Sequence, residues 1–133
     1  MKNTIISFIF ILWVCACSEE KSALISTNNE GGYLFREGSS TDSDSIYIHG
    51  KVMDLEDQAP LESSQVILYC DQVLTDENGL FRIKTSKRGL KEFSLKFRFI
   101  GYKTLDTRPL PLKDSLEIKV YLEIADQTIY HCE

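Results

Sequence analysis

The stretch Phe93-Ser94-Leu95-Lys96-Phe97-Arg98-Phe99 decides the fold class. Every odd-numbered residue in it is apolar and every even-numbered one is polar. Because side chains of a β-strand point alternately to its two faces, the pattern predicts a strand with one face on a core and the other in water. Residues 116–122 (LEIKVYL) repeat the alternation. Two such strands predict a β-sheet protein.

Further stretches with a two-residue period lie between turn signals, and no stretch shows a helical stripe. They are residues 46–53, 66–70, 73–75, 80–84 and 103–108. Together with the two strands above, they predict an all-β fold, a seven-stranded antiparallel β-sandwich. We expect this sandwich to span residues 46–124 and a C-terminal tail to span residues 125–133.

Length and charge limit what the chain can be. It has 133 residues and a formal net charge of -5, with 43% hydrophobic residues. This is room for one small domain with an ordinary core. A net negative charge gives no general attraction to phosphates, so we expect no nucleic-acid partner.

A turn is predicted between residues 75 and 81, where Asp76, Asn78 and Gly79 occur. An Asn-Gly pair suits the positive φ angles of a tight hairpin turn, after which Phe81 and Ile83 are expected to point inward. The acidic side chains also allow a metal-binding interpretation. A hairpin explains Asn78 and Gly79 without a metal, so no metal site is predicted.

The N-terminus has the pattern of an export signal. A charged start is followed by an apolar run over residues 5–16, which is too short to span a bilayer. Val14-Cys15-Ala16-Cys17 resembles the lipobox of bacterial lipoproteins. The resemblance implies a signal peptide over residues 1–16 and lipidation of Cys17 by palmitate-type acyl chains, which anchor the protein to a membrane.

The residues after the lipobox indicate where the protein is displayed. Ser18-Glu19-Glu20 is similar to the acidic export signals of lipoproteins on the surface of Bacteroidota-type bacteria. We therefore expect attachment to the outer membrane of the cell envelope, facing outward, although an acidic start to a solvated linker is an equal alternative. Whether the domain faces the periplasm or the exterior stays open.

Residues 17–45 are rich in Ser, Thr, Asn, Gly and acidic residues, which is typical of a flexible tether. Tyr33-Leu34-Phe35 interrupts this composition. These three residues either dock on the domain or a partner, or form a transient apolar cluster in a flexible chain. We favour the second interpretation.

Cysteine and histidine residues are few. After removal of Cys15 and lipidation of Cys17, only Cys70 and Cys132 remain. Outside the cytoplasm they can form a disulfide worth roughly 4 kcal/mol; the alternative is a buried Cys70 on a strand and a free Cys132. The two histidines, His49 and His131, are isolated, so neither a metal site nor a catalytic site is predicted.

Four motifs occur in order along the predicted domain. They are Ile48-His49-Gly50-Lys51-Val52-Met53-Asp54, Ala59-Pro60-Leu61, Thr75-Asp76-Glu77-Asn78-Gly79-Leu80-Phe81 and Ile100-Gly101-Tyr102-Lys103-Thr104. In their order and spacing they resemble the carboxypeptidase regulatory-like domain, a transthyretin-like (prealbumin-like) β-sandwich common in Bacteroidota surface proteins.

The resemblance implies which residues carry the family pattern: Gly50, Asp54, Pro60, Phe81, Gly101 and Tyr102. It also implies an accessory module, since in larger proteins this domain accompanies a peptidase or an outer-membrane transporter. The chain departs from the pattern at Tyr69-Cys70-Asp71-Gln72, which stands in place of a glycine-containing loop. Binding by that loop therefore does not carry over.

The function that we expect is non-catalytic, because the chain shows only scattered carboxylates and no grouped nucleophile and base. We expect a lipid-anchored interaction module that docks on an envelope protein of unknown identity, without a cofactor. The alternative is a module that binds a glycan or another small ligand through exposed aromatic side chains. The candidate aromatics are Tyr47, Tyr69, Tyr102, Tyr121 and Tyr130.

Overall fold

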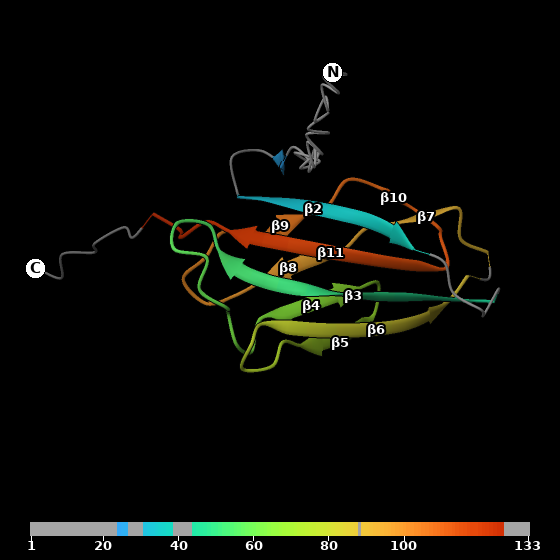
Figure 1. Cartoon of the computed structure of the whole chain (residues 1–133), viewed down its shortest axis with the longest axis horizontal. Coiled ribbons are helices and arrows are strands. Elements are labelled where there is room, and N and C mark those ends of the chain that lie inside the picture. Colours follow the sequence, from blue (N-terminus) through green and yellow to red (C-terminus); the bar gives the residue numbers. More distant parts are fainter. Residues whose placement is uncertain (1–23, 27–30, 39–43, 88, 127–133) are drawn as a thin grey trace, which may run out of the picture.

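The computed structural model describes residues 24–26, 31–38, 44–87 and 89–126. Throughout these residues the regular structure consists of β-strands, and most of them belong to two sheets that lie one behind the other (Figure 1). The all-β prediction is confirmed. Within the described residues, no helix has the length and apolar character needed to cross a membrane. The signal peptide, Cys17 and Cys132 lie outside the described residues.

The first sheet has five strands in the order β1-β2-β11-β3-β6. They are β1 (Ile25–Ser26), β2 (Gly31–Gly38), β11 (Ser115–Leu122), β3 (Ser45–Asp54) and β6 (Leu80–Ser86). The pair of β11 and β3 is parallel and the other pairs are antiparallel. Strands from the start, middle and end of the chain therefore build one layer.

The second sheet has four antiparallel strands in the order β5-β4-β8-β9. They are β5 (Asp71–Leu74), β4 (Gln65–Leu68), β8 (Lys96–Arg98) and β9 (Leu105–Asp106). A short antiparallel pair, β7 (Glu92–Phe93) with β10 (Leu110–Pro111), lies beside them. Figure 1 shows β8 and β9 behind β11.

One core fills the space between the sheets. The inward positions of β11 are Leu116, Ile118, Val120 and Leu122, all fully buried. From the opposite sheet come Val66 and Leu68 of β4 and Phe97 of β8. Phe81 of β6 meets Phe97 edge to face, with ring centroids 5.8 Å apart. The predicted alternation of residues 93–99 and 116–122 is confirmed, because their apolar positions face this core.

The interpretation of residues 17–45 as a tether is wrong for residues 31–38. These residues form β2, which pairs along its whole length with β11. Tyr33 is 1% exposed, and its hydroxyl accepts a hydrogen bond from the Arg108 backbone N–H at 3.0 Å. The polar composition misled because the residues that hold β2 in place lie some 80 positions later in the chain.

Two other details of the predicted sandwich are wrong. The sheet is not wholly antiparallel, because β11 runs parallel to β3. The expected strands also do not map one to one, since residues 93–99 divide between β7 and β8, and of residues 103–108 only Leu105 and Asp106 form a strand.

Candidate functional site

Two of the family-pattern residues, far apart in the sequence, meet at one end of the sandwich. The Tyr102 hydroxyl donates a hydrogen bond of 2.7 Å to Oδ2 of Asp54, the last residue of β3. The backbone N–H groups of Glu56 and Asp57 donate to Oδ1 of the same carboxylate at 2.7 and 3.2 Å. The Asp54 carboxylate therefore joins the turn after β3 to the loop between β8 and β9.

This cluster is arranged to hold structure. Hydrogen bonding from Tyr102 keeps the pKa of Asp54 below its usual value of 3.8, although burial opposes the shift. The same hydrogen bond is the main reason that the pKa of Tyr102 is raised to about 12. At neutral pH the carboxylate is ionised and the phenol keeps its proton, so neither group is poised for proton transfer.

Gly50 and Pro60 of the family pattern also have structural positions. A Cβ atom on Gly50 would lie 1.9 Å from the Ile118 carbonyl oxygen, so only glycine lets β3 approach β11 at this point. Pro60 forms an isolated bridge with Met53. These residues fix how the chain around them packs.

The predicted turn at Asp76 exists, but it is not a hairpin within one sheet. It joins β5 of the four-stranded sheet to β6 of the five-stranded sheet. Oδ1 of Asp76 accepts hydrogen bonds from the N–H groups of Asn78 and Leu80, both at 2.9 Å. Only Gly79 of the Asn-Gly pair has a positive φ, at 73°. Phe81 and Ile83 point inward, as predicted.

The cysteine and histidine residues do not converge in the described part of the chain. Cys70 is exposed at the turn between β4 and β5, so the expectation that it is buried on a strand is wrong. His49 is exposed on β3. Within the described residues, no group of three His, Cys, Asp or Glu side chains is placed to hold a metal ion.

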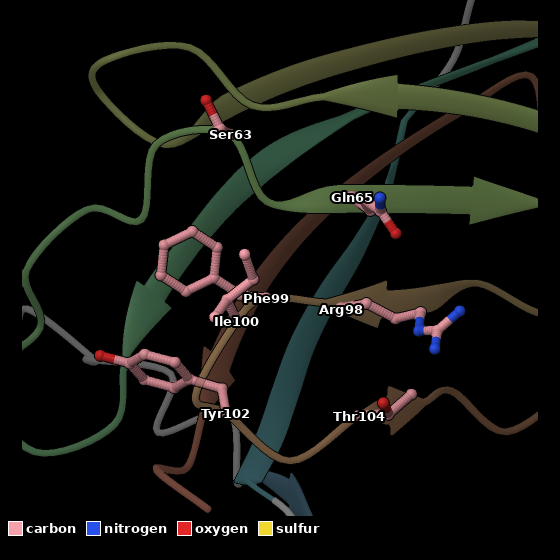
Figure 2. Close-up of a pocket in the computed structure, with 7 residues that line it drawn as sticks. All are labelled: Ser63, Gln65, Arg98, Phe99, Ile100, Tyr102 and Thr104. Carbon is pink, nitrogen blue, oxygen red and sulfur yellow. The ribbon is translucent and has the colours of Figure 1, made fainter.

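An open groove of about 560 Å³ lies at the edge of the four-stranded sheet where β4 begins and β8 ends. Figure 2 shows the residues that line it: Ser63, Gln65, Arg98, Phe99, Ile100, Tyr102 and Thr104. Gln65 and Arg98 lie opposite each other on neighbouring strands. Figure 2 shows the Arg98 guanidinium and the Tyr102 hydroxyl at opposite ends of this set of side chains. The groove thus offers apolar, aromatic and hydrogen-bonding surface together.

Ile100 is the most exposed large apolar side chain of the groove, at 94%. It stands on a turn closed by a hydrogen bond of 3.1 Å from the Tyr102 N–H to the Phe99 carbonyl. Gly101, with a φ of 85°, supplies the left-handed residue that this turn requires. Two more backbone hydrogen bonds, from Lys103 to Glu123 and from Ala125 to Gly101, hold the segment against the end of β11. Ile100 is therefore an exposed side chain on a well-held turn.

A second open groove of about 550 Å³ continues along the same face. Arg98 lines both grooves. At the far end, the exposed Tyr69 donates a hydrogen bond of 3.2 Å to the Glu92 carbonyl. Within this second groove, Lys96 of β8 and Asp106 of β9 lie opposite each other and form an ion pair of 3.7 Å.

Sequence reasoning identified only part of this surface. It nominated Tyr69 and Tyr102 as aromatic candidates, and both line a groove. Of the other aromatic candidates, Tyr47 and Tyr121 lie on the opposite sheet, and Tyr130 lies outside the described residues. Ile100, Arg98 and Gln65 were missed as binding residues. The alternation marked Arg98 as outward-facing, but nothing local in the sequence puts Gln65 beside it.

Comparisons with solved structures find distant likenesses, among which are two proteins of low sequence identity. One is a "putative membrane-associated protein of unknown function" from Bacteroides fragilis, with 17% identity and a TM-score of 0.48 over 64% of this chain and 30% of that chain. The other is 3-chlorocatechol 1,2-dioxygenase from Rhodococcus opacus, with 15% identity and a TM-score of 0.48 over 77% of this chain and 64% of that chain. The chain spans less than two thirds of either protein.

No family model and no curated protein matches the chain. The resemblance to carboxypeptidase regulatory-like domains therefore stays a prediction that rests on the four motifs. Neither structural likeness assigns an activity to the chain.

Proposed function

We propose that the protein is a lipid-anchored, non-catalytic β-sandwich module of the carboxypeptidase regulatory-like, transthyretin-like type, which binds a protein partner in the bacterial envelope. The observation that carries the proposal is Ile100, 94% exposed beside the groove. A β-branched side chain on a held turn loses little conformational entropy on binding, so it is a suitable anchor for an interface. Such anchors seat in pockets at the centre of an interface.

The predicted anchor at Cys17 supports the envelope location. Diacylation holds a protein on a membrane without a spanning segment, so the folded part is free to contact other envelope proteins. The Asp54 and Tyr102 cluster supports a structural rather than a catalytic use of the family residues, since it joins loops and is not poised for proton transfer at neutral pH.

Crosslinking in the native cells tests the proposal. The lipidated protein is crosslinked, the membranes are solubilised, and the proteins that co-purify are identified. We expect an envelope protein in stoichiometric amount with the parent chain and with Ile100→Val, which keeps most of the apolar surface. Ile100→Asp should lose it while melting at the same temperature, and Cys17→Ser should lose it through release from the membrane. Equal recovery with Ile100→Val and Ile100→Asp would refute the assignment of this groove.

A glycan ligand is the second candidate, and one observation favours it. Phe99 and Tyr102 form an aromatic pair with ring centroids 5.3 Å apart, in the groove that Gln65 and Arg98 also line. Aromatic faces with flanking amide and guanidinium groups are suited to sugars. A glycan array should then give a hit that Gln65→Ala or Arg98→Ala weakens at least tenfold; no hit above background removes this candidate.

A further inference from the structure

The outer face of the five-stranded sheet is strongly cationic. Its outward positions include the side chains of Arg36 on β2, Lys119 on β11, Lys51 on β3, and Arg82 and Lys84 on β6. We call these five residues the cationic face. Their sequence neighbours Val52, Phe81, Ile83, Ile118 and Val120 are buried in the core, and Phe35 packs against it, so the charged side chains point out.

Strand register brings these charges together. Lys119 lies directly opposite Lys51, and Arg82 lies opposite His49. The one carboxylate among the same rows of outward positions is Glu117, which pairs with Arg36. No carboxylate of the described residues lies within ion-pair distance of Lys51, Arg82 or Lys119. Among the described residues these three cations therefore form no ion pair, and only Lys119 also acts through its charge on the Glu117 carboxylate.

The face has the opposite sign to the whole chain, whose formal net charge is -5. At physiological ionic strength the Debye length is about 8 Å, and two packed sheets are about 10 Å apart. Carboxylates on the other side of the sandwich are therefore largely screened from an anion at this face. The attraction between an anionic surface and this face would therefore depend on the nearby cations and not on the net charge of the chain.

Leu24, directly before the edge strand β1, has its side chain on the outer side of the five-stranded sheet. A Cβ atom on Gly32 would lie 2.5 Å from Leu24 Cγ, so the Leu24 side chain covers Gly32. Gly32 lies opposite Tyr121 and next to the inward-pointing Tyr33, which places the covering side chain on the outer face. Cys17 precedes Leu24 by seven residues, a reach of at most about 25 Å. A lipid on Cys17 would therefore keep the β1 edge of this sheet close to the bilayer.

We propose that the cationic face docks on the anionic headgroups of the membrane that carries the lipid anchor. The proposal rests on the lipid anchorage of the proposed function. Lipid phosphates supply the charge complement, and the short connection from Cys17 supplies the proximity. Ile100 and its groove lie on the other sheet, so docking turns them away from the bilayer toward the envelope partner.

Vesicle binding by the unlipidated chain tests the face apart from the anchor. The chain from residue 17 with Cys17→Ser is sedimented with vesicles of phosphatidylglycerol and phosphatidylcholine, or of phosphatidylcholine alone. We expect binding to the anionic vesicles only, weakened by salt. Lys51→Gln/Arg82→Gln/Lys119→Gln should lower the partition coefficient roughly 100-fold, because each cation near such a surface contributes about a fivefold factor.

A second triple variant, Lys91→Gln/Arg108→Gln/Lys113→Gln, is the matched control. It removes the same charges from exposed positions outside both the cationic face and the grooves, and it should change the partition coefficient by less than about threefold. An equal fall of the partition coefficient in both triple variants would show that binding depends only on the net charge, and it would overturn the proposal. Absence of binding to anionic vesicles, or binding to an anionic polysaccharide instead, would overturn it as well. Because the assay uses neither the lipid nor a partner, its outcome is independent of the Ile100 crosslinking result.

Discussion

The two outer faces of the sandwich differ in chemistry although both come from alternating strands. The face of the five-stranded sheet gathers five cations around one paired carboxylate. The face of the four-stranded sheet is grooved, and its Lys96 pairs with Asp106 across neighbouring strands. One face therefore carries an excess of positive charge and the other leaves apolar surface uncovered.

This difference shows that the inward-facing and outward-facing residues of a strand have different roles: the first form the core, and the second determine the chemistry of the surface. Inward residues such as Ile118 and Phe97 define one core that many apolar side chains would fill. Outward residues such as Lys51 and Arg98 are exposed or half-buried and contribute little to packing. What they contribute depends on their neighbours in adjacent strands. Variants that disturb β2, the β3 and β11 contact, the turn at Tyr102 and the Lys51 and Lys119 pair test this comparison.

Removal of the Tyr33 side chain should have the largest effect. Tyr33 is 1% exposed in the core, so Tyr33→Ala is expected to lower the free energy of unfolding by about 4 kcal/mol in urea denaturation. The control is Leu34→Ala, at the next and outward position, with a loss below about 1 kcal/mol. A loss below about 1 kcal/mol for Tyr33→Ala would mean that residues 31–38 are not packed in the sandwich. The tether interpretation would then hold for them, and Arg36 of β2 would not belong to the cationic face.

Substitution of Gly50 should come next, because it separates the strands that assemble the cationic face. The side chain of Gly50→Val would meet the Ile118 carbonyl oxygen, which β11 cannot move without losing its pairing with β3. We expect a loss of about 3 kcal/mol. Gly38→Ala, on the same sheet with its nearest contact at 3.4 Å, should change stability by less than about 0.5 kcal/mol. Similar melting of the two variants would contradict the close approach of β3 and β11.

Local patterns predicted the core but not the arrangement of strands. Alternation over residues 116–122 identified each inward residue of β11, since the period of two is a local property. The glycine-rich stretch that became β2 has no comparable run of alternation. It is a strand because β11 supplies its hydrogen-bond partners, and the residues near β2 in the sequence do not indicate that pairing.

The candidate sites depend on the same long-range pairing. Asp54 and Tyr102 were both identified through the family pattern, but their hydrogen bond joins segments 48 residues apart. The cationic face was hidden by a net charge of -5, which averages over both sides of the molecule. In the sequence alone, Lys51 and Lys119 are each indistinguishable from an ordinary solvated lysine. Only the register of β3 and β11 places them side by side.

Loss of the Tyr102 hydroxyl should have a moderate effect that depends on pH. Tyr102→Phe removes a hydrogen bond to an ionised carboxylate and is expected to lower stability at pH 7 by about 1.5 kcal/mol. The pKa of Asp54 is depressed in the fold, so its contribution is present above pH 3.8 and is lost as the pH falls through the lowered value. The pKa of Tyr102 is raised, so its contribution is lost as the pH rises from 10 to about 12.

The difference between parent and Tyr102→Phe should therefore be largest between these two pH ranges. Urea denaturation at pH 3, 7 and 11 measures it. Tyr121→Phe, on the outer face of the other sheet, is the matched control and should leave stability within about 0.5 kcal/mol of the parent at pH 7. A pH-independent difference for Tyr102→Phe would mean that the hydroxyl does not bond the Asp54 carboxylate, and that the Ile100 turn is held by its backbone alone.

The smallest expected effect has the opposite sign. Lys51 lies directly opposite Lys119, and like charges at such positions destabilise a sheet. Lys51→Gln should therefore raise the free energy of unfolding by about 0.5 kcal/mol, and more at low salt, because screening weakens the repulsion. Lys113→Gln is the control: its ammonium lies 3.8 Å from the Glu37 carboxylate, so stability should fall slightly. Destabilisation by Lys51→Gln would mean that the lysine pair serves the fold itself. If Lys51→Gln instead stabilises the protein and weakens its binding to anionic vesicles, the repulsion between Lys51 and Lys119 lowers stability in the free protein. Binding to an anionic surface would then reduce this repulsion.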